Sequence, residues 1–150
     1  MEKKTTSEVE ELLKSMKPEQ LSEFYKENRN SMVDDKKAFY YYMKDVIESK
    51  NILLKNIYLQ SGVSEKYGEK IFRMERHTTN RDLIIKFCIA GHFSVDETNK
   101  ALTLYGMNPL YARNSRDAAI LLEIHNRNYD ILKVDDTLEQ QGFERLLKEE

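Results

Sequence analysis

The scarcity of glycine and proline is the feature that most limits how this chain can fold. Five glycines and two prolines stand among 150 residues, under half of the usual share of about 12%. Both residue types mark turns and the connections of sheets, so a chain with so few of them favours helices. Apolar residues also recur at helical spacing along most of the sequence. The sequence therefore predicts an all-α protein.

The composition excludes several classes of protein. Charged residues make up 33% of the chain and hydrophobic residues 40%, with a net charge of −2, which excludes a transmembrane protein and argues against wholesale disorder. A single cysteine, Cys88, rules out an internal disulfide and a cysteine-based zinc site. The opening residues MEKKTTS lack the pattern of a signal peptide. We therefore expect a cytoplasmic protein that does not contact a membrane.

The helical patterns divide the chain into three parts. Residues 1–33 predict an N-terminal helical hairpin, in which Ser7 and Glu10 form a capping box. This hairpin packs on the rest of the chain or serves as a dimerisation arm. Residues 34–111 form the central domain, and residues 112–150 form a C-terminal helical hairpin packed on it.

A turn between two short helices is the most informative segment. The pattern predicts successive helices over residues 35–49, 52–60, 65–73 and 82–90. Between the second and the third of these stands Ser61-Gly62-Val63-Ser64. There glycine permits the sharp turn, valine fills the space between the helices and serine caps the following helix. This is the layout of a helix-turn-helix.

Positive charge is concentrated on the same segment. From residue 50 to residue 81, seven basic and three acidic side chains give a net charge of +4, whereas the preceding and following parts carry −2 and −4. Such a concentration is typical of a surface that binds phosphates. An ordinary solvated face is the alternative interpretation, since the excess is modest.

The order of several motifs resembles a known family. Residues 51–111 are similar to the Xre-type (lambda-repressor-like) helix-turn-helix regulators of bacteria, and the likeness covers about the last two thirds of the chain. The motifs that carry it are Tyr67-Gly68 with Ile71-Phe72, Arg81-Asp82, the hairpin Gly106-Met107-Asn108-Pro109-Leu110-Tyr111, and Arg116-Asp117-Ala118. The resemblance implies a five-helix DNA-binding domain whose third helix, over 65–73, enters the major groove.

The candidate DNA-contacting residues lie on this third helix and beside it. They are Lys55, Ser64, Glu65, Lys66, Glu69, Lys70, Arg73 and Arg76. Glu65 and Glu69 repel phosphates unless a glutamate accepts a hydrogen bond from a cytosine amine. The outward-facing side chains of the helix carry a net charge of only +1, which favours a homodimer that reads two half-sites.

A repeat follows the helix-turn-helix. Arg81-Asp82 recurs 35 residues later as Arg116-Asp117, and Gly106-Met107 recurs 36 residues later as Gly142-Phe143. Two copies are too few for a free-standing solenoid, so they form one helical layer. The second copy carries acidic residues that we expect to face away from DNA, namely Asp130, Asp135, Asp136, Glu139 and Glu144.

The sequence offers no case for an enzyme, a metal or a cofactor. The three histidines, His77, His92 and His125, are far apart and do not have the spacing of metal ligands. Cys88 stands among isoleucines on a predicted helix, which favours a buried and inert thiol.

Two functions therefore remain. The first is a sequence-specific regulator that binds double-stranded DNA. The second is a protein-interaction adaptor or antitoxin-like module that keeps a helix-turn-helix scaffold without DNA binding and contacts its partner through the N-terminal or C-terminal helices.

Overall fold

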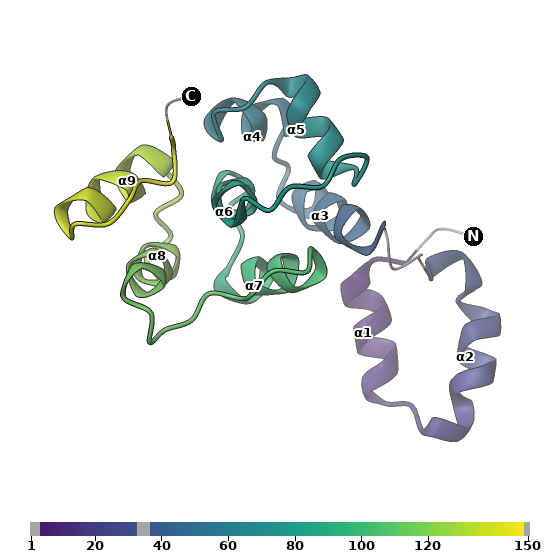
Figure 1. The fold of residues 1–150 in the computed structure, drawn as a ribbon. Helices are drawn as coiled ribbons and strands as arrows, with labels where there is room; N and C mark the ends of the chain where they lie inside the picture. Colours follow the sequence, from purple (N-terminus) through teal and green to yellow (C-terminus); the bar gives the residue numbers. More distant parts are fainter. Residues whose placement is uncertain (1–3, 33–36, 149–150) are drawn as a thin grey trace.

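The computed structural model describes residues 4–32 and 37–148, and within these ranges it contains helices and no strand (Figure 1). The prediction of an all-α protein is confirmed for this part of the chain. The α-helices are α1 (Thr6–Lys14), α2 (Leu21–Glu27), α3 (Ala38–Ser49), α4 (Leu54–Gln60), α5 (Glu65–Phe72), α6 (Arg81–Ala90), α7 (Val95–Leu104), α8 (Ser115–His125) and α9 (Ile131–Gln140).

The helix boundaries agree with the predicted ones to within a few residues. The helix expected over 35–49 is α3, and residues 33–36 lie outside the described residues. α3 has 12 residues, and no described helix combines the length and the apolar character that a membrane span requires. Short 3-10 turns, η1 (Pro18–Gln20) and η2 (Arg29–Ser31), flank α2.

Between residues 54 and 142, all of them described, three hairpins of one design follow one another: α4–α5, α6–α7 and α8–α9. The turn inside each hairpin holds one residue in the left-handed region, and these residues are Gly62 (φ 75°), His92 (φ 60°) and Arg127 (φ 57°). The next residue donates its amide to the carbonyl five positions back, as Val63 does to Tyr58 at 3.2 Å. That bond satisfies a carbonyl at the helix end. The repeat predicted from residue 81 onward therefore extends back to α4.

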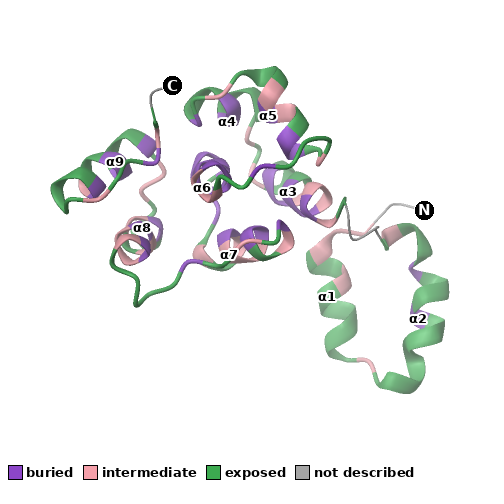
Figure 2. Ribbon diagram, in the orientation of Figure 1, coloured by how far each residue is buried: buried purple, intermediate pink, exposed green. Residues whose placement is uncertain are grey.

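α6 is the central helix of the body, by which we mean residues 37–148. All of residues 83–90 are buried, and Figure 2 shows this helix as the most buried element of the fold. α4, α7 and α9 pack around it. The expectation that Cys88 is buried is confirmed, and burial raises the pKa of its thiol.

Two ion pairs join the second hairpin to the third, and each is formed between an arginine of one hairpin and an aspartate of the other. Arg81 donates from both Nη atoms to the two carboxylate oxygens of Asp117, each at 2.9 Å. Arg116 makes the same contact with Asp82, also at 2.9 Å. Each arginine lies in the first turn of one helix and binds the aspartate in the first turn of the other. The two Arg-Asp motifs of the repeat therefore hold α6 and α8 together.

A buried carboxylate closes the C-terminal segment. Asp135 is fully buried and accepts hydrogen bonds from the amides of Leu146, at 2.5 Å, and Leu147, at 3.1 Å. Asp135 therefore serves the fold and is not part of an acidic surface. Its counterpart in the preceding hairpin, Asn99, accepts in the same way from the amide of Leu110 at 2.8 Å. Both side chains accept hydrogen bonds from backbone amides of the segment that follows their hairpin.

Residues 4–32 form an arm that projects from the body (Figure 1). α1 begins after Thr5, whose hydroxyl accepts from the amide of Glu8 at 3.2 Å. The prediction of Ser7 as the capping residue is therefore wrong by two positions, because either hydroxyl suits a cap and the apolar spacing fits both. At the base of the arm, Glu10 forms an ion pair with Lys100.

The arm buries little of its own apolar surface. All residues of α1 are described, and none of them is buried, while Phe24 is the buried side chain of α2 (Figure 2). Five large apolar side chains of residues 4–32 are exposed: Leu12, Leu13, Leu21, Tyr25 and Met32. Helices this short are marginally stable without a packing partner. The arm therefore presents an uncovered apolar surface.

Candidate nucleic-acid interface

The turn between α4 and α5 has the conformation that its four residues predict. Gly62 adopts a φ of 75°, which residues with a Cβ rarely tolerate. Val63 is half-buried against the core. The hydroxyl of Ser64 accepts from the amide of Tyr67 at 3.1 Å and so caps α5. These three local predictions are confirmed, and together they fix the angle at which α5 leaves α4.

The inner face of α5 lies close to α4. Gly68, Ile71 and Phe72 are buried, and a Cβ added to Gly68 would lie 2.5 Å from Cδ1 of Tyr58. This glycine therefore permits a close approach of the two helices. The opposite face of α5 is thereby left to the solvent.

The predicted contact residues form an exposed surface on and beside α5, which we call the basic face. Lys66, Lys70 and Arg73 are exposed, and so are Lys55, Ser64, Glu65 and Arg76, while Glu69 is half-buried. Arg73 pairs with Glu69, with 3.1 Å between Nη2 and Oε1. Among the described residues, the side chains of Lys66 and Lys70 have no ion-pair or hydrogen-bond partner. These two ammonium groups are therefore the least engaged cations of α5.

Two further cations lie around the same helix. The guanidinium of Arg76 lies over the ring of Tyr67, 5.2 Å from its centroid, which holds its charge beside α5. Lys37 donates from Nζ to the carbonyl of Arg73 at 3.0 Å, at the C-terminal end of α5. Sequence reasoning missed Lys37 because it precedes α3 and no local pattern connects it with α5. A cation at this end also compensates the helix dipole.

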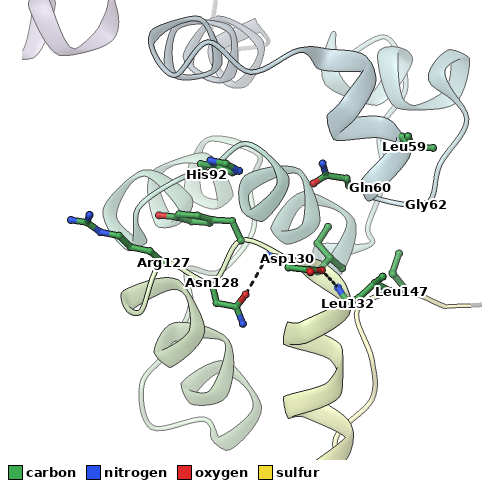
Figure 3. A pocket seen from close by; sticks show the side chains of 11 residues that line it. Leu59, Gln60, Gly62, His92, Arg127, Asn128, Asp130, Leu132 and Leu147 are labelled. Carbon is green, nitrogen blue, oxygen red and sulfur yellow. Dashed lines mark hydrogen bonds between the residues drawn. The ribbon is translucent and has the colours of Figure 1, made fainter.

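A cleft of about 740 Å³ lies beside the α4–α5 turn. Figure 3 shows the end of α4, with Gln60 and Gly62, on one side and the α8–α9 turn on the other. The ring of His92 stacks on Tyr129 at 4.7 Å between centroids. Apolar side chains of the cleft come from α4, α9 and the segment after α9, namely Leu59, Leu132 and Leu147. All three hairpin turns therefore meet around one hollow.

Comparisons with known proteins add no identification. No protein-family model, curated protein or solved structure matches this chain. In the described ranges 4–32 and 37–148, no three His, Cys, Asp or Glu side chains gather as metal ligands would. The resemblance to lambda-repressor-like regulators therefore rests on the motifs of the sequence.

Proposed function

We propose that this chain is a sequence-specific regulator of transcription that binds double-stranded DNA, of the lambda-repressor-like type found in the bacterial cytoplasm, and that α5 is its recognition helix. The observation that supports this most is the capped turn at Gly62 and Ser64, followed by Lys66 and Lys70 on the solvent side of α5. Unpaired ammonium groups four residues apart share one helix face. They suit an acidic groove lined with phosphates and base edges.

The electrostatics of the basic face support the same function. The ion pair between Arg73 and Glu69 reduces the repulsion that this carboxylate exerts on a phosphate. Glu65 stands at the start of α5, where its carboxylate can accept from the exocyclic amine of a cytosine. Across residues 50–81, whose net charge is +4, the attraction of phosphates therefore outweighs their repulsion.

The contact residues divide into two roles. Ser64, Glu65 and Lys66 lie in the first turn of α5, where a recognition helix contacts base edges. Lys70 and Arg73 lie further along and reach bases or the flanking phosphates. Arg76 and Lys55 lie outside α5 and bind phosphates, which positions the protein without reading the sequence. No cofactor and no catalytic step enters this account.

We further propose that the regulator binds DNA as a homodimer through its arm. One α5 supplies few cations, and two-fold pairing doubles the number of phosphate contacts. The exposed apolar residues of the arm include Leu12, Leu13 and Leu21. By contrast, α9 buries Ile131, Val134 and Leu138 within its own chain. An isologous pairing of two arms covers apolar surface that one chain leaves exposed.

Selection from a random duplex library at two salt concentrations tests the DNA assignment. We expect a motif to be enriched at both, with weaker retention of the library at the higher salt because phosphate contacts release counterions. Retention without any enriched motif would contradict sequence-specific binding.

A protein-interaction module is the second candidate. Leu59 is 76% exposed directly before the α4–α5 turn, and it lines the same cleft as Leu132 and Leu147. Apolar side chains at this position favour a protein partner over a phosphate backbone. Leu59→Asn distinguishes the two functions, since it removes the apolar side chain and adds no charge beside the cations of α5. Unchanged duplex affinity in this variant is the result that the DNA assignment predicts.

A further inference from the structure

A second cleft, of about 450 Å³, lies between α3, α4 and α5, away from the one beside the turn. Its apolar lining comes mainly from Ile47, Ile52, Leu53 and Phe72. Its volume lies within the range of small-molecule sites. Glu69 and Arg73 of the basic face line it as well, so the cleft and the proposed DNA contacts share two side chains.

The hydroxyl of Tyr58 is the unusual group of this cleft. Tyr58 lines the cleft and is 3% exposed, and within the described residues its Oη atom is buried without a hydrogen-bond partner. A buried hydroxyl without a partner is destabilising, and buried polar groups are nearly always satisfied by protein, water or a ligand. The orphaned hydroxyl therefore points to a missing partner.

The charges around the hydroxyl indicate where that partner lies. Burial, together with the nearby carboxylate of Glu69, raises the pKa of Tyr58 to about 12, and the guanidinium of Arg73 opposes this shift. Both charged groups line the cleft together with Tyr58. At neutral pH the hydroxyl is protonated and can donate a hydrogen bond.

The charges that line the cleft balance. Lys44 and Arg73 supply two positive groups, and Glu48 and Glu69 supply two negative ones. An anion or a cation therefore gains no net attraction, and each loses hydration when it enters an apolar space. An uncharged molecule enters without that cost.

We propose that this cleft binds an uncharged, mainly apolar small molecule that accepts a hydrogen bond from the hydroxyl of Tyr58, and that its binding changes the DNA affinity of the basic face through Glu69 and Arg73. The effect on DNA affinity rests on the proposed function, whereas the binding of the small molecule to the cleft does not. An exposed ion pair such as Glu69–Arg73 contributes little free energy, so a ligand can rearrange it.

Three probes of similar size test the binding of a small molecule to the cleft, with the full chain. Benzamide is uncharged and has an acceptor, toluene lacks an acceptor, and benzoate is charged. We expect benzamide to shift the backbone amide NMR signals of residues around the cleft, Ile52 and Phe72 among them, at lower concentration than either of the other two. The same shifts with toluene as with benzamide, or no shifts at millimolar concentrations, would overturn the proposal.

Tyr58→Phe is the decisive variant, because it removes the unpartnered oxygen and keeps the ring that packs on Phe87. We expect it to fold, since no hydrogen bond within the described part of the chain is lost, and to bind benzamide about tenfold more weakly. Its affinity for toluene should be unchanged. Tyr42→Phe is the matched control, because Tyr42 is a buried tyrosine that does not line this cleft. Equal benzamide affinity in Tyr58→Phe and the unaltered chain would refute the role of the hydroxyl.

The coupling to DNA is measured separately, with the best duplex from the selection. Saturating benzamide should change the duplex affinity of the unaltered chain and leave that of Tyr58→Phe unchanged. If the chain binds no DNA at all, the proposed function fails while the benzamide result stands. If it binds DNA and benzamide has no effect on the affinity, the coupling is refuted.

Discussion

Arg81 and Asp117 lie 36 residues apart in the sequence and form a two-pronged ion pair, with both contacts at 2.9 Å. The guanidinium of Arg81 also donates to the carbonyls of Asn108 and Pro109, each at 3.0 Å. The carboxylate of Asp117 accepts in addition from the amide of Tyr111 at 2.9 Å. One ion pair thus ties together α6, α8 and the segment that connects the second hairpin with the third.

Removal of Asp117 should therefore destabilise the fold. Asp117→Ala leaves the guanidinium of Arg81 and the amide of Tyr111 without their acceptor, and we expect the free energy of unfolding to fall by about 2–3 kcal/mol. Urea denaturation measures it. The control is Glu11→Ala, which breaks an exposed pair with Lys14 and should cost less than about 1 kcal/mol. Equal losses in the two variants would mean that the ion pair does not hold the hairpins together.

The same aspartate makes the free energy of unfolding depend on pH. Burial acts to raise the pKa of Asp117, but the hydrogen bonds from Arg81 and Tyr111 outweigh it and lower the pKa overall. The unfolded chain has the ordinary value of about 4. The stabilisation is therefore complete above that pH and is lost as the pH falls through the lower, folded-state pKa. Between pH 5 and pH 3, Asp117→Asn should lose less stability than the unaltered chain. Parallel curves would contradict this assignment.

Gly68 should not tolerate a larger side chain. Because a Cβ at this position would lie 2.5 Å from the ring of Tyr58, we expect Gly68→Leu to lower the free energy of unfolding by about 1–3 kcal/mol. Thermal melting measures the change. In a Tyr58→Ala background, where the ring is gone, the loss should be smaller. The same loss in both backgrounds would place the clash elsewhere.

The arm should control the oligomeric state. We expect light scattering to report twice the chain mass of 17.8 kDa for the unaltered protein, and the chain mass for a variant that combines Leu12→Asp and Leu13→Asp. Charges at these positions remain solvated in a monomer and would be buried in a paired arm. The control is Leu122→Asp, an exposed leucine of α8. A monomeric unaltered chain, or a control that dissociates equally, would exclude the arm as the interface.

Features decided by neighbouring residues were predictable from the sequence. The turn at Gly62 and the cap by Ser64 both depend on residues within one hairpin, where spacing fixes geometry. The helices were located for the same reason. The capping residue of α1 was misplaced because Thr5 and Ser7 offer equivalent hydroxyls two positions apart.

Features decided by contacts between distant segments were not predictable. The repeated Arg-Asp motif was visible, but nothing in a single sequence says that Arg81 binds Asp117 and Arg116 binds Asp82. The burial of Asp135 was not predictable either, because the amides that donate to it, those of Leu146 and Leu147, come from beyond the end of α9. The cleft at Tyr58 requires three helices to be packed before it exists.

The measurement that tests the central claim most directly compares Lys66→Ala with Arg76→Ala on the best selected duplex and on its single-base variants. Lys66 lies in the first turn of α5, so its loss should cost about 1–3 kcal/mol on the best duplex and relax the preference at one base position. Arg76 lies outside the helix, so its loss should weaken all duplexes alike and lower the salt slope by about one unit. Binding curves that are unchanged by both substitutions would contradict the assignment of α5 as a DNA-recognition helix.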